Sequence, residues 1–151
     1  MKNKLSTATE NTEQPNIPKR MKKQELIHLI ESLSIDKEEF YVISSGQLVL
    51  RGLLPDAGDL DIAVSLKGLE QLKKHFELKP KNNIGWFIVN DKVECVCLGP
   101  KENWKSKPEN CDGIFLQNIN DYYEYLLTSE REKDKKRIPI VEDYLKNRKG
   151  L

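Results

Sequence analysis

Hydrophobic residues recur along this chain with two different spacings. Apolar side chains three or four residues apart indicate amphipathic helices, whereas alternating or β-branched apolar runs indicate strands. The first spacing predicts helices at residues 22–35, 47–53, 66–76 and 119–127. The second predicts strands at residues 39–44, 59–65, 86–89, 92–98 and 114–116. Elements in this order indicate an α/β (α+β) fold, a small mixed β-sheet flanked by helices.

Polar and helix-breaking residues separate these elements. The PDAG sequence at residues 55–58 is typical of a turn, and Asn90-Asp91 suits the tight turn of a hairpin. Residues 101–112 are predicted to form a loop. Farther on, Ser129 and Glu132 have the spacing of a helix capping box, and Pro139 predicts a break or a new helix start.

The composition is that of a globular protein. A length of 151 residues suits a single domain, predicted for residues 21–151 after a polar tail at residues 1–20 that we expect to be disordered. No apolar run approaches the roughly 20 residues of a membrane span, and the N-terminus lacks the apolar core of a secretory signal. Three cysteines favour a reduced, cytoplasmic protein. The net charge of +1 gives no overall field for nucleic acid or for a membrane surface.

Two carboxylates stand on one side of a predicted strand. Asp59 and Asp61 alternate with Leu60 and Ile62, so both acids project to the same face. A solvated strand face paired with lysines is one interpretation. The other is a site for a hard dication, because Mg²⁺ prefers oxygen ligands and commonly takes one or two carboxylates together with substrate phosphates.

A turn of small residues, Ser44-Ser45-Gly46, lies between the preceding strand and helix. Backbone N–H groups at a helix start attract phosphate, and small residues let it approach closely. An ordinary N-cap by Ser44 or Ser45 is the alternative.

These features together resemble the signature of a known family. Ser44-Ser45-Gly46, a helix ending at Gly52, and Asp59-Leu60-Asp61-Ile62 are similar to the pattern of the DNA polymerase β-like nucleotidyltransferase superfamily. The layout is most similar to the minimal nucleotidyltransferases of bacteria and archaea, some of which occur as antitoxins or as antibiotic-modifying enzymes. The resemblance covers residues 41–98.

The resemblance implies a metal site and a third acid. Asp59 and Asp61 would bind Mg²⁺ (or Mn²⁺), and Glu94, on a following strand, would complete the site and act as a base. An exposed strand face is the alternative interpretation of Glu94. Asp91 is the weaker candidate for the third acid, because Asn90-Asp91 is better explained as a turn.

The resemblance also implies binding of a nucleoside triphosphate such as ATP. Its phosphates would lie on Ser44, Ser45 and Gly46, with Arg51 and Lys133 as candidate cations. Lys133 lies in a segment similar to the Lys-Asp element of small relatives, although a solvated charge run also explains it. The base would stack on an aromatic side chain, and Trp86, Trp104 and the tyrosines are all candidates.

The expected function is transfer of a nucleotide to an acceptor hydroxyl. The acceptor stays open between a small molecule, RNA and a toxin-like protein, and a second copy of the chain is a further candidate partner. Two departures from the family pattern, Ser44 in place of the usual glycine and Asp56 close to the acid pair, leave an alternative. It is a nucleotidyltransferase-like antitoxin or binding module with little or no catalysis.

Overall fold

The structure is a computed structural model that describes residues 20–149. The tail predicted for residues 1–20 therefore lies outside the described residues, except for Arg20, as do residues 150 and 151. No helix in the described part of the chain is both long and apolar enough to cross a membrane.

The strands of residues 20–149 form one seven-stranded sheet in the order β4-β5-β6-β3-β2-β8-β7. β3 is parallel to β6 and β2 is parallel to β8, whereas the other neighbouring pairs are antiparallel. The predicted fold class, α/β with a mixed sheet, is therefore confirmed. The strand bounds are β2 (Phe40–Ile43), β3 (Leu60–Val64), β4 (Lys79–Pro80), β5 (Trp86–Ile88), β6 (Val93–Cys97), β7 (Glu109–Cys111) and β8 (Ile114–Leu116).

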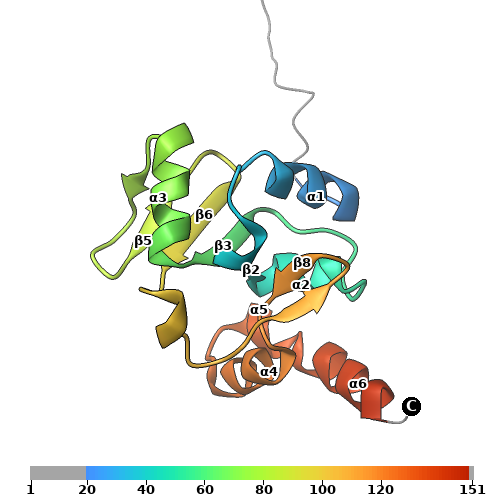
Figure 1. Cartoon of the computed structure of the whole chain (residues 1–151). Coiled ribbons are helices and arrows are strands. Elements are labelled where there is room, and N and C mark those ends of the chain that lie inside the picture. The colour runs from blue at the N-terminus through green and yellow to red at the C-terminus, as the bar shows by residue number, and fades with distance from the viewer. Residues whose placement is uncertain (1–19, 150–151) are drawn as a thin grey trace, which may run out of the picture.

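Helices lie on both sides of the sheet, with α1 and α3 on one side and α4, α5 and α6 on the other (Figure 1). The short helix α2 connects β2 to the segment leading into β3. The helix bounds are α1 (Lys23–Glu31), η1 (Lys37–Glu39), α2 (Ser44–Leu50), α3 (Leu66–His75), η2 (Lys101–Asn103), α4 (Ile119–Thr128), α5 (Glu132–Lys135) and α6 (Ile138–Lys149).

The two faces of the central strands differ in character because side chains alternate along a strand. The packed face carries buried apolar residues that contact α1 and α3; they are Phe40, Val42, Leu60, Ile62, Val64, Val93 and Cys95. The opposite face, which we call the acidic face, carries the alternate positions Tyr41, Ile43, Asp61, Ala63, Glu94 and Val96. The burial of the first face fixes the register, so the acids are held on the second.

A second apolar cluster joins α2 to the C-terminal helices. Leu48 of α2 packs with Ile119, Tyr122 and Leu126 of α4 and with Val141 of α6. Other residues of α2, Val49 and Leu50, belong to the main core. The short helix α2 is therefore held between the two clusters, and its first residue stays at the edge of the acidic face.

The predicted element order is confirmed, with differences at the edges. The helix predicted at residues 47–53 begins earlier, at Ser44. β4 and β7 were not predicted, because edge strands of two or three mostly polar residues carry little hydrophobic pattern. β7 lies in the predicted 101–112 loop.

The predicted capping box at Ser129 is wrong. The helix that follows is capped at Arg131 without a side-chain bond, and the Ser129 hydroxyl donates instead to Asp134 (2.7 Å). Pro139 lies in the first turn of α6, which confirms a new helix start there.

The close approach of α3 to η1 gives a test of this packing. A Cβ on Gly68 would lie 2.6 Å from the backbone carbonyl oxygen of Glu39. We expect Gly68→Ala to destabilise the protein by about 1–3 kcal/mol in urea unfolding, despite the better helix propensity of alanine. Glu70→Ala, on the exposed side of the same helix, should stay within about 0.5 kcal/mol of the parent. A Gly68→Ala protein as stable as the parent would contradict this helix contact.

Candidate active site

Three carboxylates lie near the place where β3 and β6 run side by side. The register pairs Asp61 with Glu94 on β6 and with Ile43 on β2. Paired positions point to the same face of a sheet, and neighbouring strands are about 4.8 Å apart, so Asp61 and Glu94 are neighbours. Asp59 lies just before β3 and is exposed. Asp61 and Glu94 therefore lie side by side, with Asp59 two residues before Asp61, but the three carboxylates are not gathered into one cluster.

Asp61 is the electrostatically strained member of the group. Its Oδ1 atom is buried and accepts no hydrogen bond from the described residues. Burial, followed by the charges of Asp59 and Glu94, raises its pKa from 3.8 to about 6. The charges of Lys81 and Lys133 act in the opposite direction. A carboxylate held in this way gains from a nearby cation.

The acids fit a dication in chemistry, although they do not converge on one point. Within residues 20–149, no group of three or more His, Cys, Asp or Glu side chains is gathered closely enough to hold a metal ion. Glu94 instead accepts a hydrogen bond from Lys81 Nζ at 2.7 Å. Asp59 and Asp61, with the bare buried oxygen of Asp61, are the residues that would hold Mg²⁺ or Mn²⁺.

A cavity of about 390 Å³ opens beside the acids. Ile43 and Glu94, which flank Asp61 in the strand register, both line it. Its other lining residues are cationic, aromatic or amide-bearing, together with Ser44; they are Lys81, Asn82, Trp86, Gln117, Tyr122, Tyr125 and Arg131. The cavity therefore combines positive charge with aromatic surface, as a site for an anionic ligand with a planar group would.

Among the aromatic candidates for base stacking, the structure separates the two tryptophans. Trp86 lines the cavity, with Lys81 Nζ 5.9 Å from the centre of its ring. Trp104 packs edge-on against the ring of Tyr41, at 5.0 Å between ring centres, and lines a different pocket. Tyr122 and Tyr125 line the same cavity as Trp86, but Tyr122 is buried in the second apolar cluster, so Trp86 and the exposed Tyr125 are the rings available for stacking.

The predicted phosphate turn presents only one of its three residues to the cavity. Ser44 lines it, whereas Ser45 and Gly46 are buried. A Cβ on Gly46 would lie 3.1 Å from a methyl group of Val42, so the glycine serves packing of α2 on β2. Ser44 has a φ of 60°, a left-handed conformation that favours glycine. Ser44, which stands where the family pattern has glycine, therefore has the left-handed backbone conformation that glycine favours.

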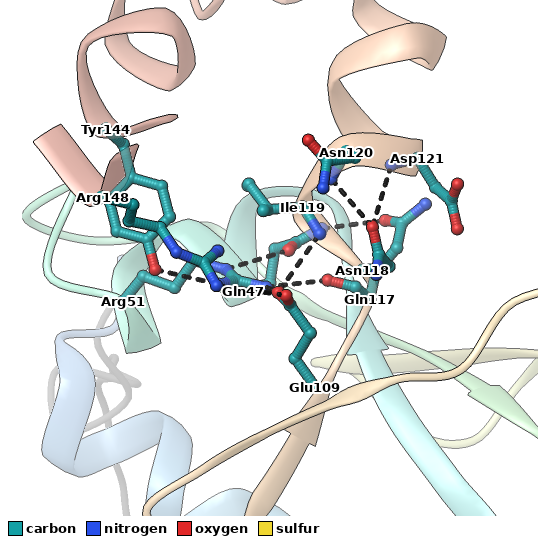
Figure 2. Close-up of polar contacts among 10 residues, drawn as sticks. All are labelled: Gln47, Arg51, Glu109, Gln117, Asn118, Ile119, Asn120, Asp121, Tyr144 and Arg148. Atoms are coloured by element: carbon teal, nitrogen blue, oxygen red, sulfur yellow. Dashed lines mark hydrogen bonds and ion pairs between the residues drawn. The ribbon is translucent and has the colours of Figure 1, made fainter. Parts of the chain in front are cut away.

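Arg51 does not reach the cavity, so its predicted role as a phosphate ligand is corrected. Its side chain is only 4% exposed and lies at the far end of α2 from Ser44. The guanidinium donates to Glu109 Oε1 (2.7 Å), to the backbone carbonyl of Gln117 (2.8 Å), to the Tyr144 hydroxyl (3.1 Å) and to Gln47 Oε1 (3.3 Å) (Figure 2). Burial would raise the pKa of Glu109, but its hydrogen bond to Arg51 and the Arg51 charge hold it below its usual value.

Two lysines face the carboxylates, one of which the sequence interpretation missed. Lys133, which is exposed on α5, lies close enough for its charge to lower the pKa of Asp61. Lys81 was not predicted, because its position opposite Glu94 depends on β4 and the hairpin folding back beside β6. The sequence signal for Lys81 is weak: the basic run Lys79-Pro80-Lys81 lies five residues before the predicted strand at residues 86–89.

Local structure explains Asp56 and Asp91, the two other acids that the sequence places close to the site. Asp56 pairs with Arg20 at 2.9 Å, so its charge is balanced outside the acid group. Asp91 is exposed in the turn between β5 and β6 and does not line the cavity. Of the two candidates for the third acid, Glu94 is the one that the fold places beside Asp61.

No protein-family model, curated protein or solved structure matches this chain. The resemblance to nucleotidyltransferases therefore rests on the motif residues of the sequence alone.

The backbone of Ser44 gives the first test of the site. Ser44→Gly should stabilise the protein by about 0.5–1 kcal/mol, because glycine adopts the left-handed conformation without the cost of a Cβ. Ser45→Gly, one residue along in the same turn, lacks this gain and should destabilise it by about 1 kcal/mol. Urea unfolding of both variants is the measurement, and the reverse order of stabilities would contradict the assigned conformation.

The raised pKa of Asp61 gives a second test. Since its pKa is 3.8 unfolded and about 6 folded, the folded protein binds the proton more tightly between these values. The contribution of Asp61 to stability is therefore largest below pH 4 and is lost as the pH rises through 6.

Asp61→Asn removes the ionisable carboxyl group, so the variant does not lose this stability as the pH rises. We expect the variant to be more stable than the parent by about 1–2 kcal/mol at pH 7, after allowance for partial exposure, and nearly equal to it at pH 4. Denaturant unfolding across this range, in the presence of a chelator, measures the difference. A constant difference at all pH values would show that Asp61 titrates normally.

Proposed function

We propose that this protein is a Mg²⁺- or Mn²⁺-dependent nucleotidyltransferase that transfers a nucleoside monophosphate from a nucleoside triphosphate to an acceptor hydroxyl. The observation that carries the proposal is Asp61. Its buried Oδ1 atom, which accepts no hydrogen bond from residues 20–149 and lies near Asp59 and Glu94, is unfavourable in a merely structural strand and is suited to binding a cation.

The cavity supports a nucleoside triphosphate as the donor. Lys81 and Arg131 line it and Lys133 lies near the carboxylates, so three positive side chains surround the place where phosphates would lie. Trp86 and Tyr125 offer aromatic surface for a base. A cavity of about 390 Å³ is within the range of ordinary small-molecule sites.

The proposed reaction is an in-line displacement at the α-phosphorus. The acceptor oxygen forms a bond to that phosphorus, the bond from phosphorus to the bridging oxygen breaks, and pyrophosphate leaves with the bonding electrons. The hydroxyl proton passes to a carboxylate, for which Glu94 is the candidate once Lys81 releases it. Asp59 and Asp61 would hold the metal ion, which would supply positive charge against the phosphates. Lys81, Arg131 and Lys133 would assist the departure of pyrophosphate.

A second candidate is a nucleotidyltransferase-like binding module, antitoxin-like and with little catalysis. The observation that favours it is the ion pair between Lys81 and Glu94, which already engages the third acid. In either case we propose a cytoplasmic protein. Its acceptor or partner would be a small molecule, RNA, a toxin-like protein or a second copy of the chain.

Transfer of label from α-³²P-labelled nucleoside triphosphates tests the proposal. Purified protein with Mg²⁺ or Mn²⁺ should label itself, RNA, a toxin-like protein or a small acceptor. Asp59→Asn and Asp61→Asn should each lower the rate about 100-fold or more, because a ligand of a catalytic metal is lost. Asp91→Asn, an acid in the hairpin turn outside the cavity, is the matched control and should stay within about threefold.

The same assay separates the two candidates. Metal-dependent binding of the triphosphate without transfer of label to any acceptor would favour the binding module. Triphosphate binding that is unchanged in Asp59→Asn and Asp61→Asn would contradict the site itself.

A further inference from the structure

We propose that the side-chain amide of Gln117 donates a hydrogen bond to a phosphate oxygen of the bound nucleotide, and that Arg51 and Gln47 are positioning residues that hold it in this orientation. The inference rests on the proposed function and assigns roles to Gln117, which lines the cavity, and to Arg51 and Gln47, which do not. It follows from a chain of hydrogen bonds in which each orientation determines the next (Figure 2).

The chain begins at Arg51, which can only donate. A guanidinium has five N–H donors and no acceptor. Its Nε atom lies 3.3 Å from the side chain of Gln47, so Gln47 must turn its carbonyl oxygen, Oε1, towards Arg51. Gln47 is completely buried, so water does not compete for its hydrogen bonds.

The orientation of Gln47 fixes that of Gln117. With its oxygen committed to Arg51, Gln47 presents its amide nitrogen, Nε2, to Gln117 at 2.8 Å. Gln117 must therefore accept through Oε1, and its own Nε2 is the end left for other partners. No acceptor within residues 20–149 takes a hydrogen bond from this nitrogen.

The backbone of Gln117 is held as firmly as its side chain. Arg51 donates a second bond, from Nη2, to the Gln117 carbonyl oxygen at 2.8 Å. The Gln117 backbone N–H donates to Val42 at 2.9 Å, which ties it to β2. Arg51 thus holds Gln117 directly at the backbone and, through Gln47, at the amide.

The place of Gln117 in the cavity identifies the acceptor. It follows β8, which is parallel to β2, and lines the cavity together with Ile43 and Ser44, at the end of β2. The same cavity carries Lys81 and Arg131, which pair with Glu94 and Asp134 and would also attract an anionic ligand. A neutral donor of fixed orientation among these cations is suited to an oxygen of the triphosphate. It adds a directional bond where lysine supplies only charge.

Three variants test the inference by isothermal titration calorimetry with Mg²⁺·ATP and with Mg²⁺·tripolyphosphate, which has no base or sugar. Gln117→Met removes the donor and should weaken binding of both probes about tenfold or more. Gln117→Glu still accepts from Gln47 but presents a carboxylate to the phosphates, and should weaken both probes further. Gln71→Met, an amide on α3 that bonds to Asp36, is the matched control and should bind both as the parent does.

Gln47→Glu is the decisive variant, because Gln47 does not line the cavity. A carboxylate there accepts from Arg51 but cannot donate, so Gln117 must turn its amide nitrogen towards the new carboxylate and its oxygen towards the ligand. We expect the same loss for both probes as in Gln117→Met, with the folded state verified by circular dichroism. The cavity-lining variants Gln117→Met and Gln117→Glu carry the test if Gln47→Glu does not fold.

The outcomes separate this inference from the proposed function. If the parent binds tripolyphosphate and the Gln117 variants bind it equally well, the assigned donor is wrong and the nucleotidyltransferase proposal stands. A loss that appears with ATP but not with tripolyphosphate overturns the phosphate assignment in favour of base or sugar recognition. If the parent binds neither probe, the proposed function fails, and this inference fails with it.

Discussion

The buried guanidinium of Arg51 is the interaction on which the arrangement around the cavity depends. A charge that is 4% exposed is stable only when its donors are satisfied, and here they bind side chains and backbone from α2, β7, α6 and the end of β8. Glu109 supplies the counter-charge and also accepts from the backbone of Ile119, so the same carboxylate helps to begin α4. The guanidiniums of Arg51 and Arg148 lie 5.6 and 5.4 Å from the centre of the Tyr144 ring, which joins α6 to the network.

The sheet supplies the complementary constraint. Its packed face is buried against α1 and α3, so a shift of register by one residue would bury Asp61 and expose Leu60 and Ile62. The acid pair across β3 and β6 is therefore held by the hydrophobic pattern of the opposite face rather than by polar contacts. Unfavourable charge at Asp61 is tolerated because the rest of the strand is firmly packed.

The sequence was sufficient for features that depend on local pattern. Alternation in residues 59–65 predicted that Asp59 and Asp61 share a face, and the strand order brings Glu94 beside Asp61. The role of Arg51 was not predictable, because a basic residue near a small-residue turn looks the same whether it faces a ligand or is buried. Its partners Glu109 and Tyr144 lie 58 and 93 residues away. Lys81 was missed for the same reason, since only the folded hairpin brings it to Glu94.

The sequence distance between Arg51 and Tyr144 has a consequence for the order in which the molecule assembles. The acids lie within residues 59–94, so their neighbourhood in the sheet can form as soon as β6 has joined β3. The network around Arg51 also needs Glu109, Gln117 and Tyr144, and it closes only when α6 has docked. During synthesis, the strands that carry the acids would therefore be in place before the wall of the cavity that carries Gln117. The cavity is in this way completed only after almost all of the described residues have been made.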